Sequence, residues 1–152
     1  KNGAYCLGPT EDAILTPLLK YFGVCKTMDD YGYRKDENGD PLIEDCLKIP
    51  FFAYYTTPEV RAIFSAIYEN HYGMQDKFLS YWGETSKRLA SNPFVIGFDP
   101  LNEPCPGTEN ILKFARDLLP GTWDHDVLGP LFEKVYAKYK EADPESIMFF
   151  EP

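Results

Sequence analysis

The sequence predicts an α/β fold with parallel strands, and two observations support this. Two short apolar runs, residues 94–98 and 147–150, lack polar alternation, which is typical of strands buried on both faces. An amphipathic helical pattern precedes each run, over about residues 58–91 and 128–139. Helices that alternate with buried strands indicate parallel strand pairing.

The helical segments have clear start and stop signals. Thr57 and Pro58 form a helix start, with threonine as the N-cap and proline at the first helical position. Gly73 is expected to break or kink the helix that follows, and Asn92-Pro93 is expected to end it. Asp143-Pro144 ends the second helix.

The remaining segments are rich in turn residues. Residues 1–57 are predicted to be a long loop region, with a short helix around residues 12–22. Residues 105–127 are predicted to be a long connection with a short helix over about residues 109–119. We expect one domain over residues 1–152, in which residues 58–152 run helix, strand, loop, helix, strand.

Composition excludes several classes of partner. The chain has 152 residues and a net charge of -9, and this charge disfavours binding to nucleic acid phosphates. No apolar run approaches the ~18 residues of a transmembrane helix, and no secretory signal opens the chain. The aromatic content of 16% fits a packed core and also a surface that stacks on sugar rings.

The cysteines leave two arrangements open. None of the four forms a CxxC pair, so the sequence predicts no zinc site, and it indicates no other metal and no cofactor. Two disulfides and four free thiols fit equally well, and the residues concerned are Cys6, Cys25, Cys46 and Cys105.

A carboxylate followed by proline comes soon after each predicted strand, as Glu103-Pro104 and Glu151-Pro152. Glycoside hydrolysis needs two carboxyl groups on either side of the glycosidic bond, one of which protonates the leaving oxygen. Asn102 beside Glu103 suits such a site, because its amide can donate to a sugar hydroxyl without adding charge. The alternative is structural: Asn102 caps a helix and Glu103 lies in its first turn.

Residues 92–104 read NPFVIGFDPLNEP, and this segment resembles the fourth-strand signature of glycoside hydrolase family 5, more narrowly of its endoglycoceramidase branch. The resemblance covers roughly residues 44–152, and the segments that support it are residues 44–48, 50–56, 75–82, 131–136 and 149–152. Pro100 departs from the family pattern and is expected to cause a local bulge, because proline removes a hydrogen bond of the strand ladder.

The resemblance implies a partial (β/α)8 TIM barrel with parallel strands, truncated at both ends and covering about the third to fifth strands. Residues 1–57 would follow the third strand. The implied function is hydrolysis of β-glycosidic bonds with retention, on glycosphingolipids or related glycosides, with Glu103 as general acid/base. The nucleophilic glutamate would lie on the seventh strand, outside this chain, so we expect the chain alone to be inactive.

The resemblance and the sequence suggest further site residues. Asn102 matches the family residue that contacts the substrate sugar, and Glu151 would line the cleft or make a structural bond. Trp123 would lie at the cleft mouth as a substrate contact or in a solvated loop. The family suggests an extracellular or lysosomal location and peripheral contact with lipid. The alternative function is a non-catalytic carbohydrate- or lipid-binding relative of the same barrel.

Overall fold

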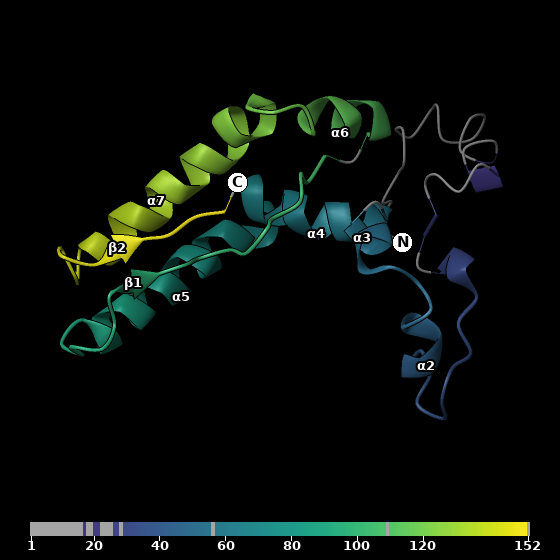
Figure 1. Cartoon of the computed structure of the whole chain (residues 1–152), viewed down its shortest axis with the longest axis horizontal. Coiled ribbons are helices and arrows are strands. Elements are labelled where there is room, and N and C mark those ends of the chain that lie inside the picture. The colour runs from purple at the N-terminus through teal and green to yellow at the C-terminus, as the bar shows by residue number, and fades with distance from the viewer. Residues whose placement is uncertain are drawn as a thin grey trace. The chain divides into compact units, whose positions relative to one another are not determined.

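The computed structural model describes residues 29–55, 57–108 and 110–151, together with residues 17, 20, 21, 26 and 27. The short helix expected at residues 12–22 and the pairing of Cys6 and Cys25 lie largely outside these residues. The elements in Figure 1 are η1 (Asp29–Tyr31), α2 (Ile43–Cys46), α3 (Phe51–Tyr55), α4 (Pro58–Tyr68), η2 (His71–Gly73), α5 (Met74–Leu89), β1 (Gly97–Phe98), α6 (Ile111–Asp117), η3 (Asp124–Leu128), α7 (Gly129–Lys140) and β2 (Ile147–Met148).

The chain divides into two compact units, each described here by itself. The first comprises Lys1–Ile63 and Gly107–Ala115, and the second comprises Phe64–Pro106 and Arg116–Pro152. Both strands and both strand-end carboxylates belong to the second unit.

The start of α4 in the first unit confirms the predicted helix cap. The hydroxyl of Thr57 accepts a hydrogen bond from the Val60 N–H at 3.4 Å and donates to the carbonyl of Tyr54 at 2.7 Å. One turn further, the buried Arg61 donates to the Thr108 carbonyl at 3.0 Å, and its guanidinium lies 5.4 Å from the centre of the Phe114 ring. Backbone and π-electron partners together compensate for the burial of this cation.

Asp45 of α2 accepts hydrogen bonds from two cationic side chains of the first unit. The Nε and Nη2 atoms of Arg34 donate to its two oxygens at 2.9 Å each, and Lys48 donates at 2.8 Å. These bonds, chiefly those from Arg34, hold the pKa of Asp45 well below its ordinary value of 3.8. The pair therefore stabilises the fold above the unfolded-state pKa, and this contribution disappears as the pH falls through the folded-state pKa.

Arg34→Gln is therefore expected to raise the pKa of Asp45 towards 3.8, because it removes the largest cause of the shift. Lys48→Gln removes the second cause and should raise that pKa less. An NMR titration of the Asp45 side-chain carboxyl carbon measures both shifts. Equal titration midpoints in Arg34→Gln and the wild type would contradict the assignment.

The predicted break at Gly73 is confirmed. Helix α4 ends at Tyr68, and α5 begins at Met74 after three residues in the left-handed region: Asn70, Tyr72 and Gly73, with φ of 57°, 56° and 71°. Buried Gln75 joins the two helices, because its amide donates to the carbonyls of Ile67 and Tyr68 at 3.0 and 2.9 Å. These are carbonyls that the end of α4 would otherwise leave without a partner.

Helices α5 and α7 pack together and against the strand pair to form the main core of the second unit. The amphipathic pattern predicted for α7 is confirmed, since Leu131, Val135 and Tyr139 are buried around Phe98 of β1. The rings of Trp82 and Tyr139 lie 5.9 and 5.5 Å from that of Phe98. Burial raises the pKa of Tyr139 to about 12, so its hydroxyl is uncharged at neutral pH.

The strands pair in parallel, as predicted, with Gly97 opposite Ile147 and Phe98 opposite Met148. Figure 1 shows them side by side, with α5 and α7 in the same unit. The Ile147 N–H donates to the Ile96 carbonyl at 3.1 Å, and the Phe149 N–H donates to the Phe98 carbonyl at 2.9 Å.

The predicted burial of the strands on both faces is wrong for the described residues. Phe98 and Met148 pack against the helices, whereas Phe94, Ile96 and Ile147 are 91%, 69% and 52% exposed. Each strand is also only two residues long. The apolar runs place apolar side chains on both faces of each strand. The described helices pack against only one of these faces, so the side chains on the other face stay exposed.

Candidate active site

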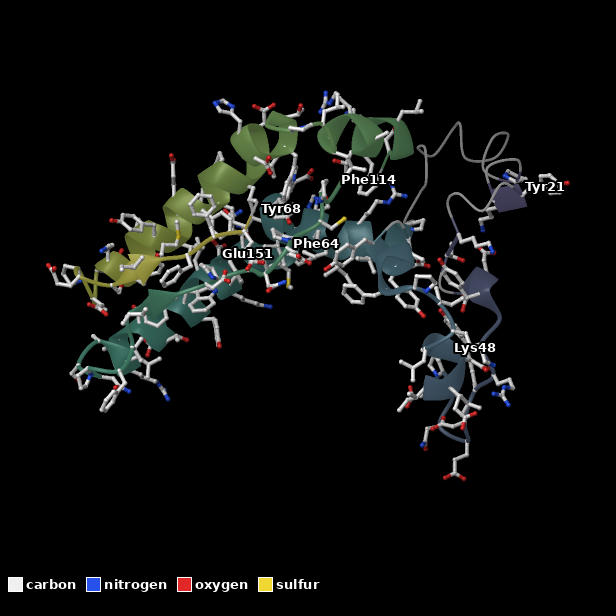
Figure 2. The ribbon with its side chains drawn as sticks, viewed as in Figure 1. Tyr21, Lys48, Phe64, Tyr68, Phe114 and Glu151 are labelled. Carbon is white, nitrogen blue, oxygen red and sulfur yellow. The ribbon has the colours of Figure 1, made fainter. Side chains whose placement is uncertain are left out.

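Glu103 and Glu151 follow the carboxyl ends of two paired parallel strands. Phe98 is the last residue of β1 and Met148 the last residue of β2, and the two residues lie opposite each other in the register. Parallel strands end at the same edge, so both carboxylates are carried beyond that edge, as the sequence predicted. Both residues are exposed, and Figure 2 labels Glu151 where the chain leaves β2.

Asn102 and Glu103 form a bend between β1 and the next helix. That helix, α6, begins at Ile111, so the structural alternative in which Asn102 caps a helix is wrong. Glu103 has φ of 40°, in the left-handed region, and it precedes a proline. Such a backbone conformation costs a non-glycine residue about 1–3 kcal/mol and persists only where neighbouring structure imposes it.

The residues that follow the bend are buried although they belong to no helix or strand. Pro104, Cys105 and Pro106 are all buried, and Cys105 is 4% exposed. The hydroxyl of Tyr68 on α4 donates to the Cys105 carbonyl at 2.9 Å. Pro100, which departs from the family pattern, is also buried. The loop that carries Glu103 is therefore held on both sides of the bend.

Trp123 is a core residue in this structure. Its side chain is 5% exposed and packs with Leu128 and Phe132, while its ring lies 5.4 Å from that of Tyr68 at 69°. The prediction of a solvated loop is wrong, because η3 and α7 follow directly and enclose the ring in their own apolar contacts. A direct contact between Trp123 and substrate stays a prediction.

An apolar hollow of about 400 Å³ lies beside the end of β2. Met148 and Phe150 line it from the strand side, and Phe132 and Tyr136 line it from α7, with Asp124 and Glu133 among its polar residues. Asn102 and Glu103 are not among its lining residues. The hollow therefore lies on the helix-covered side of the strand pair, apart from the bend.

Sequence reasoning did not single out Tyr68. An aromatic residue at the end of a helical pattern ordinarily indicates core packing, and nothing in the sequence marks the partner of its hydroxyl.

Among the described residues no group of three or more His, Cys, Asp or Glu side chains is placed to hold a metal ion. No helix in the described part of the chain combines the length and apolar character needed to cross a membrane.

The second unit is thus an α/β unit whose parallel strands direct polar residues to one edge, where such folds bind their ligands. Two curated proteins are similar to the chain: an endoglycoceramidase of Hydra vulgaris, 32% identical over 115 residues, and an endoglycoceramidase of Cyanea nozakii, 29% identical over 115 residues. Each match covers 76% of this chain but only 22% of the relative.

The chain is therefore similar to a segment of endoglycoceramidases, as its sequence resemblance predicted. It spans less than a quarter of the length of the curated relatives that it matches. No family model matches the sequence, and no solved structure matches the chain. Each match takes in 115 of the 152 residues. A span of that length cannot be placed in this chain without including Glu103, so both matches contain the segment around this residue.

Proposed function

We propose that the protein containing this chain is a retaining glycoside hydrolase that cleaves the β-glycosidic bond between the oligosaccharide and the ceramide of glycosphingolipids. The similarity to two endoglycoceramidases over a span that includes Glu103 carries this proposal. The parallel pairing of β1 and β2 supports it, because it takes Glu103 and Glu151 beyond the same edge of the sheet. We further propose that the two strands are part of a (β/α)8 barrel.

The apolar residues on the open side of the strands support the barrel. Ile147 and Phe149, which are 52% and 44% exposed, alternate with Met148 and Phe150. Met148 packs against the apolar cluster of α7, and the ring of Phe150 contacts that of Phe132 although Phe150 is itself 60% exposed. In a (β/α)8 barrel one face of every strand meets the helices and the other meets the side chains of the barrel interior. Further strands of such a barrel would bury the side chains that are exposed here.

In the proposed mechanism the carboxylic acid of Glu103 protonates the glycosidic oxygen as the bond to the sugar breaks. A carboxylate outside this chain attacks the anomeric carbon, and the retaining geometry places it about 5–5.5 Å from Glu103. The Glu103 carboxylate then removes a proton from the water that releases the sugar. Asn102 contacts the substrate sugar, and Glu151 lines the cleft.

The full-length protein incubated with a glycosphingolipid tests this function. The expected products are ceramide and the intact oligosaccharide, identified by mass spectrometry, and the first anomer seen by proton NMR should be β. Release of single sugars from the outer end, or an initial α anomer, would contradict the proposal. Binding of the glycolipid without any hydrolysis would instead favour the non-catalytic relative.

A further inference from the structure

The bend at Glu103 requires a fixed point on its far side. On the near side, β1 is held to β2 by the bond from the Phe149 N–H to the Phe98 carbonyl. Glu103 itself adopts a left-handed φ of 40° directly before Pro104, where the backbone ordinarily prefers extended conformations. Without an anchor beyond Pro104, the bend would relax and its carboxylate would change direction.

The hydroxyl of Tyr68 provides this anchor. It donates to the carbonyl of Cys105 at 2.9 Å, two residues after Glu103, and the carbonyl belongs to a buried residue. Because water has little access to a buried carbonyl, this bond meets little competition from solvent. The bond joins α4 directly to the loop that carries the proposed acid/base.

Tyr68 is itself held firmly. Its ring stacks on that of Phe64 at 6.0 Å and 17°, and it makes an edge-to-face contact with the ring of Trp123 at 5.4 Å. Figure 2 labels Phe64 and Tyr68 together on α4. The amide of Gln75 holds the backbone carbonyl of Tyr68 at 2.9 Å. A hydroxyl fixed in this way can act as a rigid support, whereas a mobile side chain would follow the loop.

We propose that Tyr68, buttressed by Trp123, is a positioning residue that fixes the direction of the Glu103 carboxylate through the carbonyl of Cys105. The inference rests on the proposed function, because it assumes that Glu103 donates a proton to the leaving group. It gives Trp123 an indirect part in catalysis: the indole supports Tyr68 from within the core.

Tyr68→Phe in the full-length protein tests the inference, because it removes one hydroxyl and keeps the ring that packs on Phe64 and Trp123. With a glycoside whose leaving group needs protonation, kcat/KM should fall about five- to tenfold, the usual effect of one lost hydrogen bond. With a dinitrophenyl glycoside, which leaves without a proton, kcat/KM should stay within about twofold of the wild type.

Tyr54→Phe is the matched control. Tyr54 lies in the other unit and also donates its hydroxyl to a cysteine carbonyl, that of Cys46, at 2.9 Å. It should change neither kcat/KM value. Its thermal unfolding midpoint should fall at least as much as that of Tyr68→Phe, because the Tyr54 hydroxyl also hydrogen-bonds to the hydroxyl of Tyr33 at 2.7 Å. Equal kinetics for Tyr68→Phe and Tyr54→Phe would overturn the inference, as would an equal loss on both substrates.

A third variant separates this inference from the function on which it rests. If Glu103→Gln loses activity while Tyr68→Phe matches its control, only the positioning role is overturned. If Glu103→Gln keeps full activity on the glycosphingolipid, Glu103 is not the acid of the proposed mechanism, and Tyr68 has no acid to position. If the wild type does not hydrolyse the glycosphingolipid, the proposed function itself fails. A selective loss in Tyr68→Phe together with an inactive Glu103→Gln supports both.

Discussion

Glu103→Gln in the full-length protein is expected to lower kcat/KM for a glycosphingolipid by about 100- to 10,000-fold, the usual contribution of a general acid. The amide is nearly the same size as the carboxyl group but has no proton to give to the leaving oxygen. Glu103 is exposed in a bend that belongs to no helix, so the substitution should leave the unfolding free energy nearly unchanged.

Glu84→Gln provides the control for this experiment. Glu84 is an exposed glutamate of α5 in the same unit, and it has no place in the proposed mechanism. The same change of charge there should leave kcat/KM within about twofold of the wild type, as for most exposed positions. If Glu84→Gln and Glu103→Gln lost activity equally, the effect would come from net charge and the acid/base role would be refuted.

Azide provides a second readout for the same residue. A dinitrophenyl glycoside attaches its sugar to the enzyme without a general acid, and a small anion can then attack the anomeric carbon without a general base. Glu103→Ala with this substrate and azide should therefore yield a β-glycosyl azide. An α-glycosyl azide, or no azide product at all, would mean that the residue has another role.

The parts of the fold that the sequence predicted correctly are those set by local chemistry. The hydroxyl of Thr57 caps α4, Gly73 ends a stretch of left-handed residues, and the apolar face of α7 is buried as its spacing indicated. Parallel pairing also followed from the alternation of helices and strands. Each of these features depends on residues close in sequence or on a simple rule of chain connection.

The parts that failed depend on contacts between residues far apart in the chain. Trp123 was expected near solvent, but η3 and α7 enclose it together with Tyr68, which lies far earlier in the sequence. Phe94 and Ile96 were expected inside a sheet, but the described elements leave them exposed. The bond from Tyr68 to Cys105 has no sequence signature, because any tyrosine hydroxyl can donate to any carbonyl within reach.

Gly97→Ala is expected to destabilise the full-length protein by about 3 kcal/mol, at the upper end of the cost of overpacking a well-packed site. A Cβ atom at this position would lie 2.1 Å from the backbone carbonyl oxygen of Ile147 and 3.0 Å from the ring of Phe149. The nearest obstacle is backbone, so no rotation of a side chain can relieve the clash. The two strands would have to separate.

Gly83→Ala in α5 is the same chemical change, but it is expected to raise the stability of the protein. Nothing lies within 4 Å of a Cβ atom there, and alanine favours a helix over glycine, so stability should rise by up to about 1 kcal/mol. Denaturant unfolding measures both differences, and equal shifts for the two variants would show that the strands do not approach as closely as described. The pairing of Gly97 with Ile147 also sets the register in which Glu103 and Glu151 leave the sheet. Gly97→Ala should therefore lose glycosidase activity even at temperatures where the protein stays folded. Gly83→Ala should keep its activity under the same conditions.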